Sequence, residues 1–235
     1  MIDYEKPIPF GGDGEPYSEK AFIDSPLIPV EESERIEIAM QYPVLGCKNA
    51  ETRCLGRKEA VERLYQAAAL LPEGYRFRIW DFWRPFALQA ELFDFYKPAI
   101  VAQFHLEDMP EEELHRFMNQ FVARPNPDPD CPPGHTTGGA IDLTIVGPDG
   151  KELEMGTAFD AFSDLTHAAY FEREEAAGLP HADEIRKNRR LLYNVMTAAG
   201  FAGITSEWWH FCFGERCWAE KMKHPAVYRG IFEYE

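Results

Sequence analysis

The sequence contains no apolar run long enough to span a membrane, and it has too few basic residues to balance its acids. Its 235 residues include 24 lysines and arginines against 40 aspartates and glutamates, which gives a formal net charge of -16 at pH 7. A surface of this sign repels nucleic-acid phosphates and anionic lipid headgroups. We therefore expect neither nucleic acid nor a membrane as a partner, and the sequence leaves the oligomeric state open.

Cysteine is also scarce, and its spacing does not indicate a disulfide framework. The five cysteines leave an odd thiol and form no Cys-x-x-Cys pair; they are Cys47, Cys54, Cys131, Cys212 and Cys217. Residues 1–7 lack the basic segment and following apolar run of a secretory signal. We expect reduced thiols in a cytoplasmic protein.

The length and the periodicity of apolar residues predict one α+β domain over residues 1–235. Apolar spacing predicts helices over residues 57–71, 86–96, 110–122 and 184–199, and strands over residues 75–81, 140–146, 151–155 and 207–213. Residues 1–35 are rich in proline, glycine and acids, which favours an irregular arm around the domain. Residues 104–133 are predicted to form an insertion that ends in a proline-rich loop.

Two short runs carry residues that suit a catalytic metal. His135 precedes the predicted strand 140–146 and Asp142 lies within it, while Glu207 and His210 come much later. A catalytic zinc takes three protein ligands and keeps one position for water, and the remaining glutamate can move a proton of that water. The His135–Asp142 spacing alone is common among surface and capping residues. The two runs together make a zinc hydrolase the better hypothesis.

Two local features qualify this hypothesis. Glu207 and His210 point to opposite faces of a flat strand, so a shared site requires a bulge or a strand end. The alternative is a buried histidine bonded to the backbone, with Glu207 at the rim. The small residues 138–140 would let the backbone approach an ion or a substrate closely.

Arg84 is the third candidate. It precedes Pro85, which holds its backbone extended, and an arginine at such a junction can stabilise a developing oxyanion. The alternative is a salt bridge with Asp81, which the position alone favours.

Four separated motifs together resemble the VanX-type D-alanyl-D-alanine dipeptidases. They are WDFWRP at residues 80–85, HTTGGAID at 135–142, MGTAFD at 155–160 and EWWH at 207–210, in the family's order and spacing. The resemblance covers residues 36–214. It implies the hedgehog/DD-peptidase fold, in which a small antiparallel sheet flanked by helices surrounds one zinc ion.

The resemblance also implies a role for each site residue. Zinc is bound by His135, Asp142 and His210. Glu207 is the general base that deprotonates the zinc-activated water and later protonates the leaving amine. Arg84 stabilises the oxyanion. Asp160 receives the free amino group of the substrate, although by itself it also suits a helix N-cap before residues 161–162.

The implied activity is zinc-dependent hydrolysis of a small dipeptide, D-Ala-D-Ala or a related cell-wall dipeptide. Two departures leave the side chains and stereochemistry of the substrate open. Pro133 stands where the family usually has a serine that contacts the substrate, and the family's substrate-facing tyrosine has no clear match near residues 36–42. The alternatives are a DD- or LD-carboxypeptidase acting on longer wall peptides and a non-catalytic zinc-binding module.

Overall fold

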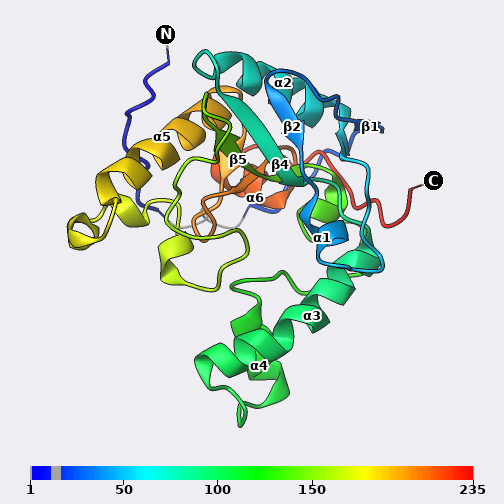
Figure 1. Cartoon of the computed structure of the whole chain (residues 1–235). Coiled ribbons are helices and arrows are strands. Elements are labelled where there is room, and N and C mark those ends of the chain that lie inside the picture. Colours follow the sequence, from blue (N-terminus) through cyan, green and yellow to red (C-terminus); the bar gives the residue numbers. More distant parts are fainter. Residues whose placement is uncertain (1, 12–16, 235) are drawn as a thin grey trace.

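The computed structural model describes residues 2–11 and 17–234 (Figure 1). A five-stranded sheet has the order β2 (Ile36–Ile38), β4 (Arg76–Asp81), β5 (Ala140–Val146), β7 (His210–Cys212) and β6 (Ala202–Gly203). Neighbouring strands are antiparallel, except that β2 and β4 are parallel. Helices pack around this small sheet, so the predicted α+β class is confirmed.

The central strand β5 has all seven residues buried, because elements cover both of its faces. Helices α2 (Lys58–Leu70) and α5 (Ala182–Ala198) share the main apolar core with it, as Leu64 and Leu192 cluster with Leu143. Burying each such side chain contributes about 1.5–3 kcal/mol. Both helices and strands β4 and β5 were predicted from periodicity to within two residues. Rigid packing of β5 matters for function because Asp142 lies on it.

Helix α3 (Phe86–Phe104) runs well beyond the predicted end at residue 96. Pro98 lies inside the helix and removes one backbone hydrogen bond, which normally costs about 3 kcal/mol. The chain stays helical because Ile100 and neighbouring apolar residues are buried in a second core cluster with Leu114 and Met118 of α4 (Glu111–Met118). The helices α3 and α4 form a lobe beside the sheet (Figure 1).

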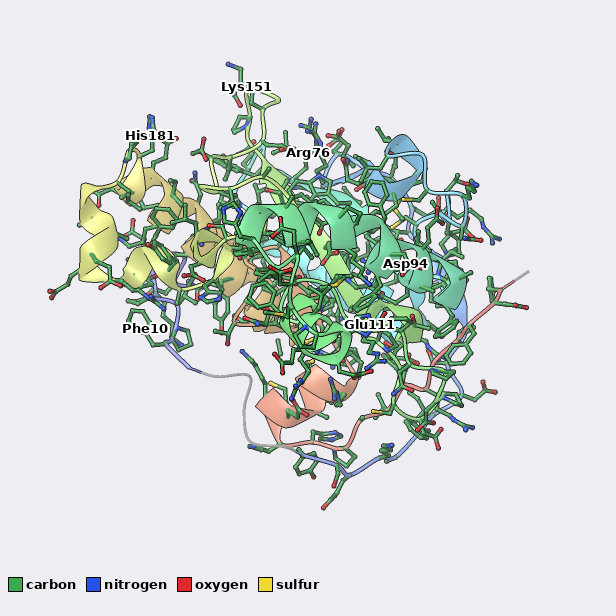
Figure 2. All side chains as sticks on the ribbon, turned by 90° about the horizontal axis from the view of Figure 1, so that it is seen from below. Phe10, Arg76, Asp94, Glu111, Lys151 and His181 are labelled. Atoms are coloured by element: carbon green, nitrogen blue, oxygen red, sulfur yellow. The ribbon has the colours of Figure 1, made fainter. Side chains whose placement is uncertain are left out.

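Three other predicted segments differ from the structure: two are shorter than expected, and one contains a strand that was not expected. Residues 151–155 form only a single bridge, between Val146 and Glu152, after an exposed turn next to Lys151, whose side chain points away from the molecule (Figure 2). The predicted strand 207–213 begins only at His210. The N-terminal arm contains β1 (Leu27–Pro29), which pairs antiparallel with β3 (Leu55–Arg57).

The remaining elements are short. They are α1 (Gln41–Val44), α6 (Arg216–Met222), and the 3-10 turns η1 (His135–Thr137), η2 (Asp164–Thr166), η3 (Tyr170–Glu172) and η4 (Glu174–Gly178). Among the helices of the described residues, none has the length and apolar character needed to cross a membrane.

Candidate active site

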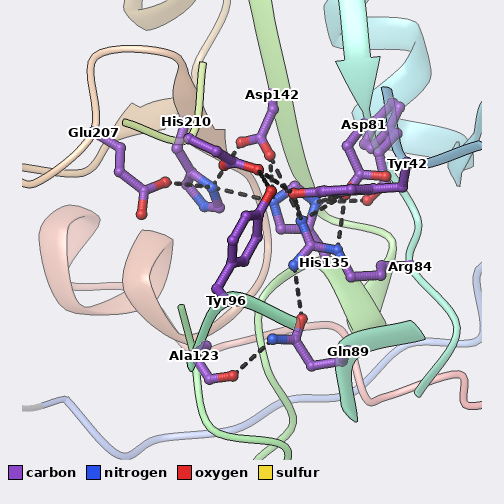
Figure 3. Close-up of polar contacts among 12 residues, drawn as sticks. Tyr42, Asp81, Arg84, Gln89, Tyr96, Ala123, His135, Asp142, Glu207 and His210 are labelled. Atoms are coloured by element: carbon purple, nitrogen blue, oxygen red, sulfur yellow. Dashed lines mark hydrogen bonds and ion pairs between the residues drawn. The ribbon is translucent and has the colours of Figure 1, made fainter. Parts of the chain in front are cut away.

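The three predicted metal ligands meet at one end of the sheet. His135 lies in η1, just before β5, and Asp142 on β5 stands directly opposite His210 on β7. Nε2 of His135 lies 3.2 Å from Oδ2 of Asp142 and 3.2 Å from Nδ1 of His210. Nδ1 of His210 lies 3.0 Å from Oδ1 of Asp142 (Figure 3). Strand pairing therefore brings together residues that are far apart in the sequence.

The geometry of these atoms fits one divalent metal ion. With bonds of about 2.0–2.1 Å, the ligand atoms of a tetrahedral site lie about 3.3–3.4 Å apart, close to the observed separations. Nδ1 of His135 donates a hydrogen bond to the carbonyl oxygen of Phe82 at 2.7 Å, which leaves the lone pair on Nε2. Two imidazoles and a carboxylate thus direct lone pairs at a common point.

The charges of the ligands depend on one another. Burial alone would raise the pKa of Asp142, but His135 and His210 hold that pKa well below its ordinary value. Burial alone would lower the pKa of His210, but Asp142 and Glu207 raise it to about 9. Asp142 is therefore an ionised ligand, whereas His210 must release a proton when it binds a metal.

Glu207 lies beside the ligand cluster, as we call the group of His135, Asp142 and His210. Its Oε2 is 3.6 Å from Nδ1 of His210. Residues 208 and 209 form a turn, and β7 starts only at His210. Because the strand starts only at His210, the side chains of Glu207 and His210 lie on the same side. A strand end at this place is what the hypothesis of a shared site required. Burial raises the pKa of Glu207 to about 8, and the charge of His210 opposes this rise.

Arg84 is buried on the other side of the cluster and makes the salt bridge that was considered as its alternative role. Its Nε donates to Oδ2 of Asp81 at 2.9 Å, so the salt bridge exists. Nη1 donates to Oε1 of Gln89 and Nη2 donates to the hydroxyl of Tyr42, at 2.9 and 3.0 Å. Nη2 also lies 3.7 Å from Oδ2 of Asp142, so the guanidinium faces the ligand cluster.

Asp160 caps no helix, since residues 161 and 162 are not helical. Its backbone is left-handed, with φ of 55°, and its Oδ2 accepts hydrogen bonds from the hydroxyls of Tyr96 at 2.6 Å and Tyr42 at 3.1 Å. Burial raises the pKa of Asp160 to about 6, while the hydrogen bond from Tyr96 opposes this rise.

Sequence reasoning missed Tyr42, Tyr96 and Gln89 as site residues. Tyr42 ends the run 36–42, in which no clear match to the family's tyrosine was found, and the structure places it between Arg84 and Asp160. The signal for Tyr42 was therefore present, whereas nothing local distinguished the other two.

The small residues at 138 and 139 allow close packing against other parts of the protein, and neither lines the cavity beside the predicted metal ligands. A Cβ on Gly139 would collide with the carbonyl oxygen of Phe213, and one on Gly138 would lie 2.5 Å from Leu27. Gly138 also has φ of 75°, in the left-handed region. These contacts fix the turn that carries His135.

A cavity of about 700 Å³ opens over the ligand cluster. Its lining includes the ligands, Glu207, Arg84, Asp160 and Pro133, and the segment 115–126 of the predicted insertion forms one wall. The volume lies within the range of small-molecule sites.

Comparisons with known proteins give one matching family model and several similar proteins. The family model described as D-ala-D-ala dipeptidase, of the Peptidase_M15 family, matches residues 34–228. The D-alanyl-D-alanine dipeptidase of Synechocystis is 32% identical over 186 residues, which cover 72% of this chain and 74% of the relative. The D-alanyl-D-alanine dipeptidase of Escherichia coli is 32% identical over 162 residues, which cover 68% and 67%.

Proposed function

Because the chain belongs to the D-alanyl-D-alanine dipeptidase family of metallopeptidases, we propose that it hydrolyses small dipeptides at a zinc ion held by His135, Asp142 and His210. The observation that carries this proposal is the convergence of three side chains in a cavity that also contains Glu207 and Arg84. Nε2 of His135 and Nδ1 of His210 lie 3.2 Å apart, and each lies 3.0–3.2 Å from one carboxylate oxygen of Asp142. D-Ala-D-Ala or a related cell-wall dipeptide is the proposed substrate.

The residues around the ligands divide the chemistry among them. Zinc, when bound, supplies Lewis acidity that polarises a carbonyl oxygen and makes water a stronger acid. Glu207 accepts a proton from the attacking water and returns it to the leaving amine. Arg84 stabilises the negative charge that develops on the carbonyl oxygen.

Asp160 is proposed to bind the ammonium group of the substrate. Tyr42 and Tyr96 both donate to its Oδ2, which orients the carboxylate and fills the space behind it. A peptide extended at the amino end would have to displace these rings. This arrangement favours a free dipeptide over the longer substrate of a DD- or LD-carboxypeptidase. Hydrolysis of a free dipeptide compared with its N-acylated form separates the two activities.

Replacing Glu207 with alanine tests the mechanism. The Glu207→Ala variant should bind zinc in a 1:1 ratio, as the wild type does, and lose dipeptide turnover. Near-wild-type activity in this variant would contradict the proposed base. A mass-spectrometric screen of the zinc-loaded wild type against L,L-, L,D- and D,D-dipeptides identifies the stereochemistry. Bound zinc without activity on the whole panel would instead support a non-catalytic module.

A further inference from the structure

One guanidinium on the cavity wall has no role in the proposed reaction. Arg216, the first residue of α6, lines the same cavity as the three metal ligands. Within residues 2–11 and 17–234, no hydrogen bond or ion pair of its side chain is seen. Burial alone would lower the pKa of Arg216, but the nearby Cys217 and Glu220 raise it above its ordinary value. An arginine in this setting is available to bind an anion.

The start of α6 lies directly against the turn that carries His135. Oε2 of Glu215 approaches Gly134, the residue before His135, to within 3.5 Å of the position that a Cβ would occupy. Oε1 of Glu215 accepts a hydrogen bond from the backbone N–H of Trp218 at 2.8 Å. The buried carboxylate of Glu215 thus caps the N-terminus of α6 and forms no ion pair with the neighbouring Arg216.

The other arginines of the cavity are already engaged. Arg84 donates to three side chains, as described above. Arg124 forms an ion pair with Glu112 at 3.4 Å, and Nε of Arg116 donates to the carbonyl oxygen of Glu112 at 3.3 Å. Arg216 is therefore the cavity arginine without a protein partner among the described residues.

The proposed substrate carries an anionic group that suits Arg216. A dipeptide at neutral pH carries an ammonium group, assigned above to Asp160, and a carboxylate at the other end. That carboxylate loses water on entering the cavity and needs a charged donor in exchange. The consecutive prolines at 132 and 133, which line the same cavity, have no N–H to offer.

We propose that Arg216 binds the C-terminal carboxylate of the substrate and so selects peptides that end one residue after the scissile bond. The planar guanidinium can hold both carboxylate oxygens at once, which an ammonium group cannot do. This inference rests on the proposed dipeptidase function, and it adds a specificity-determining residue at the carboxyl end of the substrate.

The kinetic test compares a dipeptide with its C-terminal amide. For the zinc-loaded wild type, we expect kcat/KM to be about 10–100-fold lower for the amide, as for the loss of a charge-assisted hydrogen bond. Arg216→Gln should lower kcat/KM for the free dipeptide by a similar factor, mainly through KM, and leave the amide unchanged. Arg116→Gln, a neutralised arginine on the same cavity wall, should retain the wild-type preference. Equal rates for acid and amide in the wild type would overturn the inference, as would an unchanged preference in Arg216→Gln.

Calorimetry on the zinc-loaded Glu207→Ala variant compares the affinities for the free dipeptide and its amide without turnover. Tighter binding of the free dipeptide than of the amide, abolished by adding Arg216→Gln, supports the inference even if the wild type hydrolyses neither compound. In that case only the dipeptidase proposal fails. Equal binding of acid and amide overturns the role of Arg216 while leaving the dipeptidase proposal intact.

Discussion

Asp81 and His135 are joined through a single carboxylate oxygen, which also binds Arg84. Oδ2 of Asp81 lies 3.2 Å from Nδ1 of His135 and accepts from Nε of Arg84 at 2.9 Å. Asp81 thus orients both a metal ligand and the proposed oxyanion-stabilising residue. Loss of such an outer partner typically weakens metal binding about 10–100-fold. Since the carbonyl oxygen of Phe82 also accepts from Nδ1, we expect Asp81→Asn to lower zinc affinity by about tenfold, near the lower end of that range.

Competition with a chromophoric chelator measures this change. Asp94→Asn is the matched control, because Asp94 is exposed on α3 (Figure 2) and does not line the cavity. Equal zinc affinities for Asp81→Asn and Asp94→Asn would show that Phe82 alone orients His135.

Gln89 links Arg84 to the insertion, and its replacement should impair the chemical step. Its Oε1 accepts from Nη1 of Arg84 at 2.9 Å, and its Nε2 donates to the carbonyl oxygen of Ala123 at 2.7 Å. Gln89→Leu removes both bonds in a buried place, where an unpaired polar group costs about 1–3 kcal/mol. We expect kcat to fall by about tenfold while zinc content stays at the wild-type level.

Steady-state kinetics with metal analysis tests the role of Gln89. Gln66→Leu, at an exposed position on α2, should leave both quantities unchanged. If Gln89→Leu lowers the melting temperature but not kcat, Gln89 serves stability alone.

The sequence predicted the elements that carry the metal ligands because their patterns are local. β5 is a short apolar run between turn signals, and the helical spacing of α2 and α5 is regular. The end of α3 was wrong because the tertiary packing of Ile100 overrides the local effect of Pro98.

The site residues that were not predicted from the sequence come from segments far apart in the chain. No local sequence pattern shows that these segments meet in the fold. Tyr42 lies on α1 and Tyr96 on α3, and only the fold brings both to Asp160, which the family resemblance indicated. Gln89 is one polar residue on an apolar helix face, and its importance appears only when Arg84 and Ala123 are placed beside it.

The amino-binding role of Asp160 predicts a pH dependence of KM. Burial raises the pKa of Asp160 to about 6, so its carboxyl group becomes protonated as the pH falls through that value. The substrate ammonium then loses its partner, and KM should rise by up to about tenfold per pH unit below pH 6. Asp160→Asn should have a raised KM at pH 7.5 that changes little towards lower pH.

The ratio of wild-type to Asp160→Asn kcat/KM, followed from pH 5 to pH 8, isolates this effect from the pH dependence of metal binding. Asp164→Asn, an exposed acid nearby in the sequence, serves as the control. A ratio that stays constant with pH would exclude Asp160 as the partner of the ammonium group.

Glu172 anchors the N-terminal arm to α5, and its contribution to stability should depend on pH. Its Oε1 accepts from the backbone N–H of Ile8 at 3.0 Å and from Nε of Arg190 at 2.7 Å, and its side chain is 6% exposed. Burial alone would raise the pKa of Glu172, but Arg190 and the Ile8 amide lower it below its ordinary value of 4.5. A depressed pKa stabilises the folded state above pH 4.5, and this stabilisation is lost as the pH falls through the folded-state pKa.

Glu172→Gln should therefore reduce the free energy of unfolding by about 1–3 kcal/mol at pH 7, as expected for a buried bond between charged groups. The difference from the wild type should shrink as the pH falls from 4.5 towards 3, because both proteins then carry a neutral group at this position. Urea unfolding at pH 7, 5, 4 and 3 measures the difference, with the exposed Glu174→Gln as control. If the wild-type and Glu172→Gln curves stay parallel over this range, the ion pair with Arg190 adds nothing to stability, and the arm is held by the remaining contacts.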